Sequence, residues 1–139
     1  MSTPSAQSLA DFYAGPASPY AAFPQEHRSG GSMPVTIIRA DQDAHDTVDP
    51  AVPEISLSLS LKSEMGFRWD VGDGLTEQVV LRTGQFCFAP ANTAVRFDCH
   101  DPHTILVLNF PDNAAAAVLA DHNLGSLSSF DALTGQTFF

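Results

Sequence analysis

Residues 84–95, Gly-Gln-Phe-Cys-Phe-Ala-Pro-Ala-Asn-Thr-Ala-Val, carry the clearest indication of the chain's fold. They combine a turn glycine, a short apolar strand, a corner that begins at Pro90 and the start of a second strand. Asn92 is expected to adopt a positive φ in that corner, because asparagine enters the left-handed region more readily than most residues other than glycine. Strand, corner and strand in such close succession indicate antiparallel β-structure.

The most regular periodicity lies upstream, over residues 55–61, where leucine or isoleucine alternates with serine. The two rows are Ile55, Leu57, Leu59 and Leu61 on one side and Ser56, Ser58 and Ser60 on the other. A period of two over seven residues predicts a strand with one buried face. The pattern does not decide which row faces the interior.

Similar short segments fill the chain from residue 34 to residue 110. Strands are expected at 35–39, 55–61, 65–71, 76–82, 85–89, 94–99 and 103–110, and a loop at 41–53. The turn Gly72-Asp73-Gly74 predicts a tight hairpin. Seven short strands separated by turn residues predict a mainly β fold, an antiparallel sandwich or barrel. One helix is expected after them, at 112–123, capped by Asp112 and ended by Gly125.

Residues 84–95 also resemble the second motif of the cupin superfamily, in which a metal-binding histidine follows a glycine and a Pro-x-Gly turn. Asn92 replaces the second glycine of the motif, and Val95 replaces the histidine. With the apolar strand 103–110 and the helix start at Pro111, residues 34–125 are similar to the N-terminal cupin sensor domain of AraC-type transcriptional regulators. This resemblance implies a cupin-like antiparallel β-barrel of the double-stranded β-helix, or jelly-roll, type with one C-terminal helix.

The composition divides the chain around that barrel. Residues 1–33 are rich in Ser, Ala, Pro and Gly and predict an irregular N-terminal arm, and residues 34–125 hold the barrel and its helix. Four aromatic residues lie in the arm: Phe12, Tyr13, Tyr20 and Phe23. They favour docking of the arm on the barrel, and a loosely ordered tail is the alternative. Residues 126–139 are expected to begin a segment that continues in a longer polypeptide, with a natural small cupin as the alternative.

The balance of charges excludes some partners. The chain has 139 residues, 16 acidic against 6 basic, and a formal net charge of −10. Such a surface repels polyanions, so we expect no direct contact with nucleic acid. No apolar run reaches the ~20 residues that a membrane helix needs, and no secretory signal is present, so a cytoplasmic protein is predicted. Cys87 and Cys99 are expected to be buried, reduced thiols.

The sequence offers little for catalysis. Five histidines occur, at positions 27, 45, 100, 103 and 122, and none forms His-x-His. His100 and His103 flank a proline turn, where side chains are expected to be solvated. Because Val95 cannot bind a metal, we predict no metal and no cofactor. With unactivated thiols and no Gly-x-Ser-x-Gly motif, we also expect no enzymatic activity.

A binding pocket inside the barrel is the remaining possibility. The resemblance directs Val95 inward, and Phe97 follows on the same face of the strand. Phe67 and Trp69 form a second inward-facing row. These four are the candidate ligand-binding residues: Phe67, Trp69, Val95 and Phe97. A purely structural role in the core is the alternative for each of them.

The resemblance implies a non-catalytic domain that senses a small, largely apolar effector and forms a homodimer. A DNA-binding module that this chain lacks would contact the DNA. Two alternatives stay open: a stand-alone cupin that acts as a dimerisation or interaction module, and a cupin enzyme with atypical metal ligands. Metal analysis and ligand-dependent stability distinguish the three.

Overall fold

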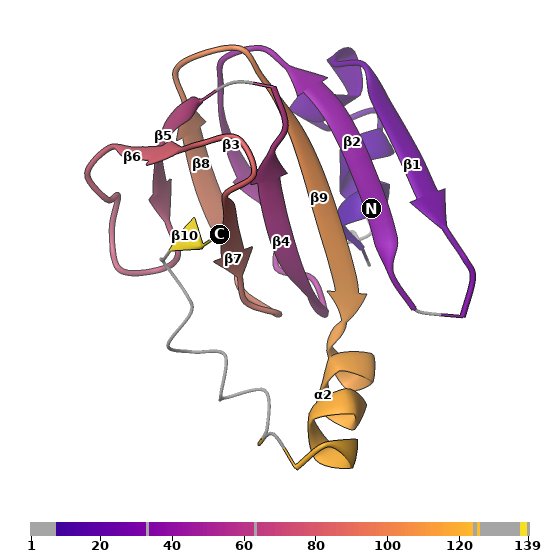
Figure 1. Cartoon of the computed structure of the whole chain (residues 1–139). Helices are drawn as coiled ribbons and strands as arrows, with labels where there is room; N and C mark the ends of the chain where they lie inside the picture. Colours follow the sequence, from indigo (N-terminus) through magenta and orange to yellow (C-terminus); the bar gives the residue numbers. More distant parts are fainter. Residues whose placement is uncertain (1–7, 33, 63, 124, 126–136, 139) are drawn as a thin grey trace, which may run out of the picture.

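The computed structural model of the chain describes residues 8–32, 34–62, 64–123, 125 and 137–138. Two antiparallel sheets face each other (Figure 1), one ordered β1-β2-β9-β4-β7-β10 and the other β3-β8-β5-β6. The strands are β1 (Gln25–Ser29), β2 (Thr36–Gln42), β3 (His45–Asp49), β4 (Glu54–Ser60), β5 (Met65–Asp70), β6 (Val79–Leu81), β7 (Phe86–Ala89), β8 (Val95–Cys99), β9 (His103–Pro111) and β10 (Thr137–Phe138). The mainly β architecture is therefore as predicted.

The serine row of β4 faces the interior between the sheets. Ser56 lies opposite Asn109 in the register of β4 with β9, and its hydroxyl donates to Asn109 Oδ1 at 2.7 Å. Ser56 and Ser60 are buried and Ser58 is half-buried; on the outer side of the sheet Ile55 is buried, and Leu57 and Leu59 are half-buried. The structure thus answers the question that the alternation left open.

Besides the two-residue β10, two strands were not predicted. β3 lies within residues 41–53, which were expected to form a loop, and it pairs with β8 along its whole length. β1 belongs to the arm that was expected to be irregular, and it pairs with β2. Both strands are rich in charged and polar residues, so the hydrophobic pattern that reveals a half-buried strand is weak in them. Backbone pairing with a neighbouring strand determines them instead.

The rest of the N-terminal arm docks on the barrel, which confirms the first reading of its aromatic residues for the described part, residues 8–32. It contains a short helix, α1 (Leu9–Ala14), and a 3₁₀ turn, η1 (Pro19–Ala22). Tyr13 and Tyr20 are buried, and Tyr20 is only 1% exposed. A helix therefore precedes the strands, although the sequence predicted one only after them.

The turn residues behave as expected at one corner and differently at another. Gly84 and Asn92 have φ values of 82° and 59°, and the Asn92 N–H donates to the Val52 carbonyl at 2.7 Å. The predicted tight hairpin at Gly72–Gly74 is wrong, because residues 71–78 form a longer connection between β5 and β6. Asp70 Oδ1 organises its start by accepting the N–H groups of Gly72 and Gly74.

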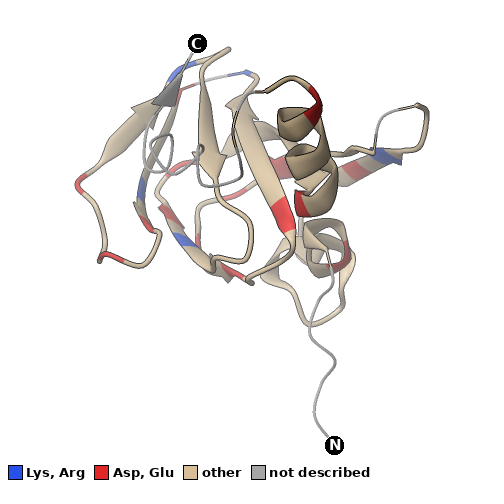
Figure 2. Ribbon diagram, turned by 90° about the horizontal axis from the view of Figure 1, so that it is seen from below, with Lys and Arg blue, Asp and Glu red and all other residues tan. Residues whose placement is uncertain are grey.

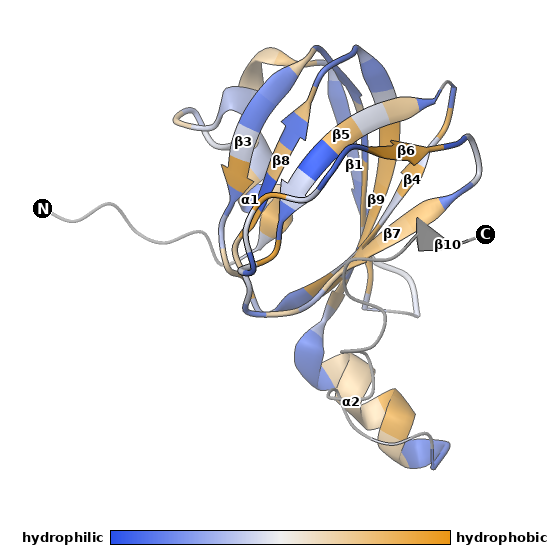
Figure 3. Cartoon of the chain, turned by 90° about the vertical axis from the view of Figure 1, so that its left-hand side faces the viewer, coloured by the Kyte–Doolittle hydropathy of each residue, from blue (hydrophilic) through white to orange (hydrophobic). Residues whose placement is uncertain are grey.

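The C-terminal helix is α2 (Asp112–Asp121), two residues shorter than predicted. Asp112 is its first residue, and the N-cap position is occupied by Pro111, whose side chain makes no capping hydrogen bond. Leu119 is buried, whereas its neighbour Val118 is 57% exposed. Seen from the side, α2 extends away from the end of the barrel (Figure 3). In the described part of the chain, no helix is long and apolar enough to cross a membrane.

Acidic positions are spread over the strands, loops and α2, and basic positions are few (Figure 2). The buried apolar core fills the space between the two sheets and reaches the arm. Cys87 and Cys99 are both free and buried, as expected. The predicted segment 126–139 lies outside the described residues except for the backbone of 137–138, which pairs with β7.

Candidate functional site

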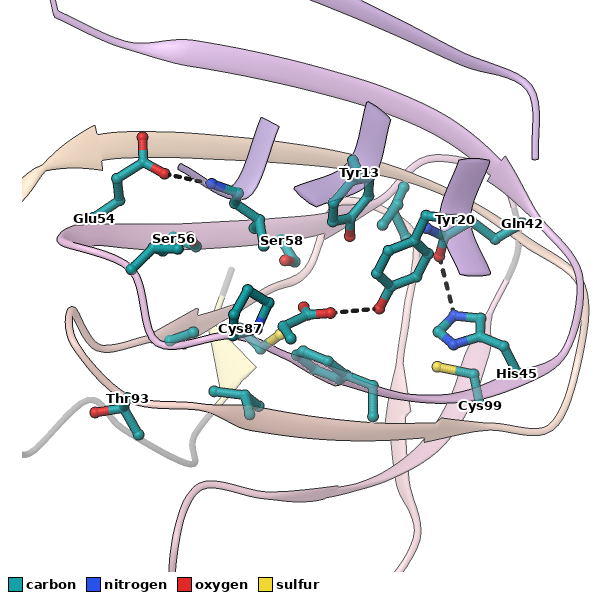
Figure 4. Close-up of a pocket in the computed structure, with 18 of the residues that line it drawn as sticks. Tyr13, Tyr20, Gln42, His45, Glu54, Ser56, Ser58, Cys87, Thr93 and Cys99 are labelled. Carbon is teal, nitrogen blue, oxygen red and sulfur yellow. Dashed lines mark hydrogen bonds between the residues drawn. The ribbon is translucent and has the colours of Figure 1, made fainter. Parts of the chain in front are cut away.

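The interior of the barrel contains a cavity of about 50 Å³ (Figure 4). Each enclosed water needs roughly 10–15 Å³ of such space, so the cavity holds only a few water molecules. One part of its wall is apolar and another carries polar and titratable groups. The apolar part includes Val52, Met65, Val95, Phe97 and Ile105, and the polar part includes Gln42, His45, Asp49, Glu54, Ser56, Ser58, Cys99 and His103.

The N-terminal arm closes one side of this cavity. The rings of Tyr13 and Tyr20 stack with centroids 4.2 Å apart, and both residues line the cavity. The Tyr20 hydroxyl donates to Asp49 Oδ1 at 2.7 Å, and the Leu9 N–H donates to Glu54 Oε1 at 2.8 Å. Figure 4 shows both contacts from the arm to the barrel. The arm is therefore fixed by carboxylates that belong to the cavity wall.

Asp49 is the buried carboxyl group of this contact. Burial raises its pKa to about 7, although the hydrogen bond from Tyr20 favours the charged form and opposes the rise. Burial also raises the pKa of Tyr20 far above its ordinary value, so its hydroxyl remains a donor. The Asp49 carboxyl therefore changes its protonation near neutral pH, inside the cavity and against the arm.

A second polar group lies at the end of the barrel where β2 continues into β3 and β8 into β9. A ring nitrogen of His45, the Sγ atom of Cys99 and a ring nitrogen of His103 lie within 4.8 Å of one another. His45 is opposite Cys99 in the register of β3 with β8, and Gln42 is opposite His103 in the register of β2 with β9. One cross-strand pair from each sheet thus meets inside the barrel.

Gln42 lies between the two imidazoles. Its Oε1 atom is 2.8 Å from His103 Nε2 and 3.2 Å from His45 Nε2. The other nitrogen of each ring also has a protein partner: His103 Nδ1 is 2.8 Å from the Asp101 carbonyl, and His45 Nδ1 is 3.1 Å from Thr47 Oγ1. Both rings are therefore fixed in orientation, with their Nε2 atoms directed to one point.

Burial disfavours charge in this group. It lowers the pKa of His45 to about 4, with His103 contributing in the same direction, and it lowers the pKa of His103. Burial likewise raises the pKa of the Cys99 thiol to about 12. Near neutral pH the cluster consists of two neutral imidazoles and a thiol. Each of these groups has an electron pair that it can donate to a metal ion or to a hydrogen-bond donor.

The candidate ligand-binding residues separate into two pairs. Val95 and Phe97 line the cavity. Phe67 and Trp69 are buried beside it and pack against Phe97, with ring centroids 6.0 Å from that of Phe97 in both cases, but they do not line it. Trp69 Nε1 has no hydrogen-bond partner among the described residues. Ligand binding by any of the four stays a prediction.

The expectation of solvated side chains at His100 and His103 is wrong for His103, and His45 also lies partly inside the barrel. His103 is 5% exposed and His45 is half-buried, whereas His100 is exposed as expected. The side chain of Arg96, which follows Val95 on β8, is on the outer surface of the barrel, where it forms an ion pair with Asp46 at 2.7 Å. His45 was missed because its segment was assigned to a loop. If the segment had been recognised as a strand, the alternation of side chains would have placed residues 45, 47 and 49 on one face.

The residue at the position of the cupin motif histidine cannot bind a metal in this chain. Val95 occupies it, is 3% exposed, and has an isopropyl group with no electron pair to donate. The absence of a metal remains an expectation for the chain as a whole: it was based on Val95 and on histidines that are dispersed in the sequence, but the fold brings His45 and His103 together beside Cys99.

No protein-family model matches the chain, and no curated protein does. Solved structures with similar folds include the plu4264 protein of Photorhabdus luminescens, with a TM-score of 0.51, 8% identity, and coverage of 73% of this chain and 85% of that one. A candidate mannose-6-phosphate isomerase of Ralstonia eutropha JMP134 gives a TM-score of 0.50 and 17% identity, covering 77% of this chain and 98% of that one.

A cupin protein of the RmlC-like type from Desulfovibrio desulfuricans is also similar, with a TM-score of 0.49 and 18% identity over 64% of this chain and 82% of that one. At these identities the likeness concerns the fold and not the activity. The likeness to the two structures with TM-scores of 0.51 and 0.50, together with the two facing antiparallel sheets and the helix α2, agrees with the fold predicted from residues 84–95. The chain is a cupin-like antiparallel β-barrel with one C-terminal helix.

Proposed function

We propose that the chain is a non-catalytic sensor domain that binds a small effector inside its barrel. The observation that carries the proposal is the interior cavity, one wall of which is formed by the N-terminal arm rather than by the barrel itself. A barrel that served only as a scaffold would gain stability by filling this space with side chains. A cavity with polar groups in its wall, covered by an arm that is not part of the barrel, suits a domain that binds a ligand inside.

The size of the cavity defines how an effector enters. Pockets for small organic ligands usually have roughly 300 Å³ or more, and this cavity has about 50 Å³. The rings of Tyr13 and Tyr20 take up the adjoining space. An effector larger than a few atoms therefore displaces these rings, and its binding is coupled to a change in the position of the arm.

The wall of the cavity indicates the chemistry of the effector. Val95, Phe97 and Ile105 offer an apolar surface, which suits the largely apolar molecule expected from the sequence. The Asp49 carboxylate accepts a hydrogen bond from the Tyr20 hydroxyl, and it would lose this donor if the tyrosine ring moved away. An effector with an apolar body and one hydroxyl or amino group would replace the tyrosine at that carboxylate.

We further propose that such a domain belongs to a transcriptional regulator of the AraC type, acts as a homodimer and leaves DNA contact to another part of the polypeptide. The similarity of residues 84–95 and 103–111 to that group supports this role. The net charge of −10 supports the absence of direct contact with nucleic acid.

A thermal-shift screen of small apolar alcohols and amines tests the binding proposal. A ligand present at about 100 times its Kd stabilises the native state by about 2.7 kcal/mol, which raises the Tm by several degrees for a domain of this size. Val95→Phe places a larger side chain in the cavity and should abolish the response. Val48→Phe is the matched control, because Val48 is 56% exposed on β3.

An absence of hits in the wild type, or hits that Val95→Phe retains, would contradict a binding site inside the barrel. Light scattering over a range of concentrations provides the comparison with an interaction module. Dimers that form without any ligand response favour that alternative. Monomers whose Tm rises with ligand support the binding proposal and remove the homodimer from it.

A further inference from the structure

We propose that Gln42, His45, Cys99 and His103 form a binding site for a zinc-type transition-metal ion at the end of the barrel where β2 continues into β3 and β8 into β9. The ring nitrogens and the thiolate are the expected ligands. Two imidazole nitrogens and one sulfur form a set that zinc accepts in a tetrahedral arrangement. This inference does not depend on the proposed sensing function.

The distances between the donor atoms are close to those of a bound ion. Tetrahedral zinc, with Zn–N bonds of roughly 2.1 Å and Zn–S bonds of roughly 2.3 Å, separates its ligand atoms by about 3.4–3.6 Å. The three donor atoms of the cluster lie within 4.8 Å of one another. Contraction by about 1 Å would bring them to coordination distance, which side-chain rotation provides without a change of strand register.

The other ring nitrogens have the partners that metal-binding histidines usually have. His103 Nδ1 lies 2.8 Å from the Asp101 carbonyl, which can only accept a hydrogen bond, so this nitrogen carries the proton. The neutral ring then presents the electron pair of Nε2 to the interior. His45 Nδ1 is held by the Thr47 hydroxyl, and its Nε2 is directed to the same point.

The contact between Gln42 and His103 joins two atoms that both carry electron pairs. Gln42 Oε1 is 2.8 Å from His103 Nε2, where a carbonyl oxygen faces a ring nitrogen that has no proton to donate. Gln42 Nε2 makes no hydrogen bond of good geometry among the described residues, although Gln42 is only 3% exposed; the Tyr13 hydroxyl is the nearby acceptor, and the Gln42 amide favours the charged form of that hydroxyl. A cation at the convergence point would bind both ring nitrogens and accept the amide oxygen as a further ligand, and this would resolve the conflict.

The site is distinct from the position used by the cupin motif. The motif places its histidine at residue 95, four residues before Cys99 on β8. At about 3.4 Å per residue the two positions are roughly 14 Å apart along the strand. The ligand set here comes from the opposite end of β8 and from the cross-strand partners of that end.

Cobalt(II) titration of the chelator-treated, untagged protein under reducing conditions tests the proposal, because cobalt replaces zinc and its bond to a thiolate gives a charge-transfer absorption in the near ultraviolet. The wild type should bind one equivalent with this absorption, and zinc should displace the cobalt. Cys87→Ser is the matched control: it also changes a buried thiol but leaves Cys99 as the only cysteine of the chain. The absorption should persist in that variant.

Cys99→Ser should abolish the absorption. His103→Gln should weaken cobalt binding by at least about 10-fold, a lower limit set by what loss of even an outer-shell partner usually costs. His100→Gln alters an exposed histidine beside the cluster and should leave the affinity unchanged. Absence of the charge-transfer absorption in both the wild type and Cys87→Ser would overturn the proposal. This outcome does not require Cys99→Ser to fold.

Discussion

Replacement of Asp49 by asparagine should stabilise the protein at alkaline pH and leave its stability nearly unchanged at acidic pH. The asparagine would keep the shape of the side chain and a carbonyl oxygen that accepts the Tyr20 hydroxyl, which lies 2.7 Å from Oδ1 in the wild type. It would remove the buried negative charge. The variant therefore isolates the cost of ionising this carboxyl inside the barrel.

The pKa of Asp49 gives the size of the effect. Burial raises the pKa of Asp49 from 3.8 to about 7. At 1.36 kcal/mol for each pKa unit, the free energy of unfolding is ~4 kcal/mol lower when Asp49 is ionised than when it is protonated. Between pH 4 and pH 7 the folded state binds more protons at Asp49 than the unfolded state does. The contribution of Asp49 to stability is thus complete below about pH 4 and is lost as the pH rises through 7.

His45 acts in the opposite direction over part of the same range. Because burial lowers its pKa from 6.5 to about 4, the unfolded state binds more protons there, and stability falls as the pH drops from 6.5 towards 4. The wild-type curve alone therefore mixes two opposed effects. The difference between Asp49→Asn and the wild type cancels the contribution of His45, which both proteins share.

Urea unfolding at pH 5, 6, 7 and 8, with a chelator present, measures this difference. The advantage of the variant should increase by about 3 kcal/mol from pH 5 to pH 8. Asp46→Asn is the matched control on the same strand: Asp46 is exposed, and its hydrogen bonds with Arg96 lower the pKa of its carboxyl. An Asp49→Asn difference that stays constant from pH 5 to pH 8 would refute the reasoning.

Three further substitutions test the packing around the site by urea unfolding. Tyr20→Phe removes the donor to Asp49 and should cost roughly 1–3 kcal/mol at pH 8, when the carboxylate is charged; an unchanged stability would mean that solvent reaches the carboxylate. Asn92→Ala should cost about 1 kcal/mol more than Asn92→Gly, because φ is 59° at this position; equal costs would contradict that backbone conformation. Ile38→Ala should cost roughly 2–5 kcal/mol, and the half-buried Ile37→Ala distinctly less; the reverse order would contradict the register of β2.

The sequence determined those features whose causes are local. Leucine and serine in strict alternation can form a half-buried strand and little else, so β4 was predicted within one residue of its bounds. Gly84 and Asn92 can adopt positive φ at low cost, and the corner that they make is present. Alternation along β8 also placed Val95, Phe97 and Cys99 on one face, and all three line the cavity.

Only the tertiary structure decided which face of a strand is inside. The two rows of β4 are equivalent in periodicity, and the serines face inward because Ser56 pairs with the buried Asn109 on β9. On the other side of the sheet, Leu57 and Leu59 of the apolar row are half-buried and Ile55 is buried. Transfer of leucine from water favours the opposite arrangement residue by residue, so the packing of the whole barrel, and not the strand, sets the orientation.

The polar groups of the interior depend on long-range pairing in the same way. His45 and Cys99 are far apart in the sequence and become neighbours only through the register of β3 with β8, a strand pair whose first member has no apolar pattern. Tyr20 reaches Asp49 only because the arm docks across the barrel. The sequence shows which residues can donate or accept hydrogen bonds. Which distant residues meet depends on the complete fold, because each such contact closes a long loop at an entropic cost.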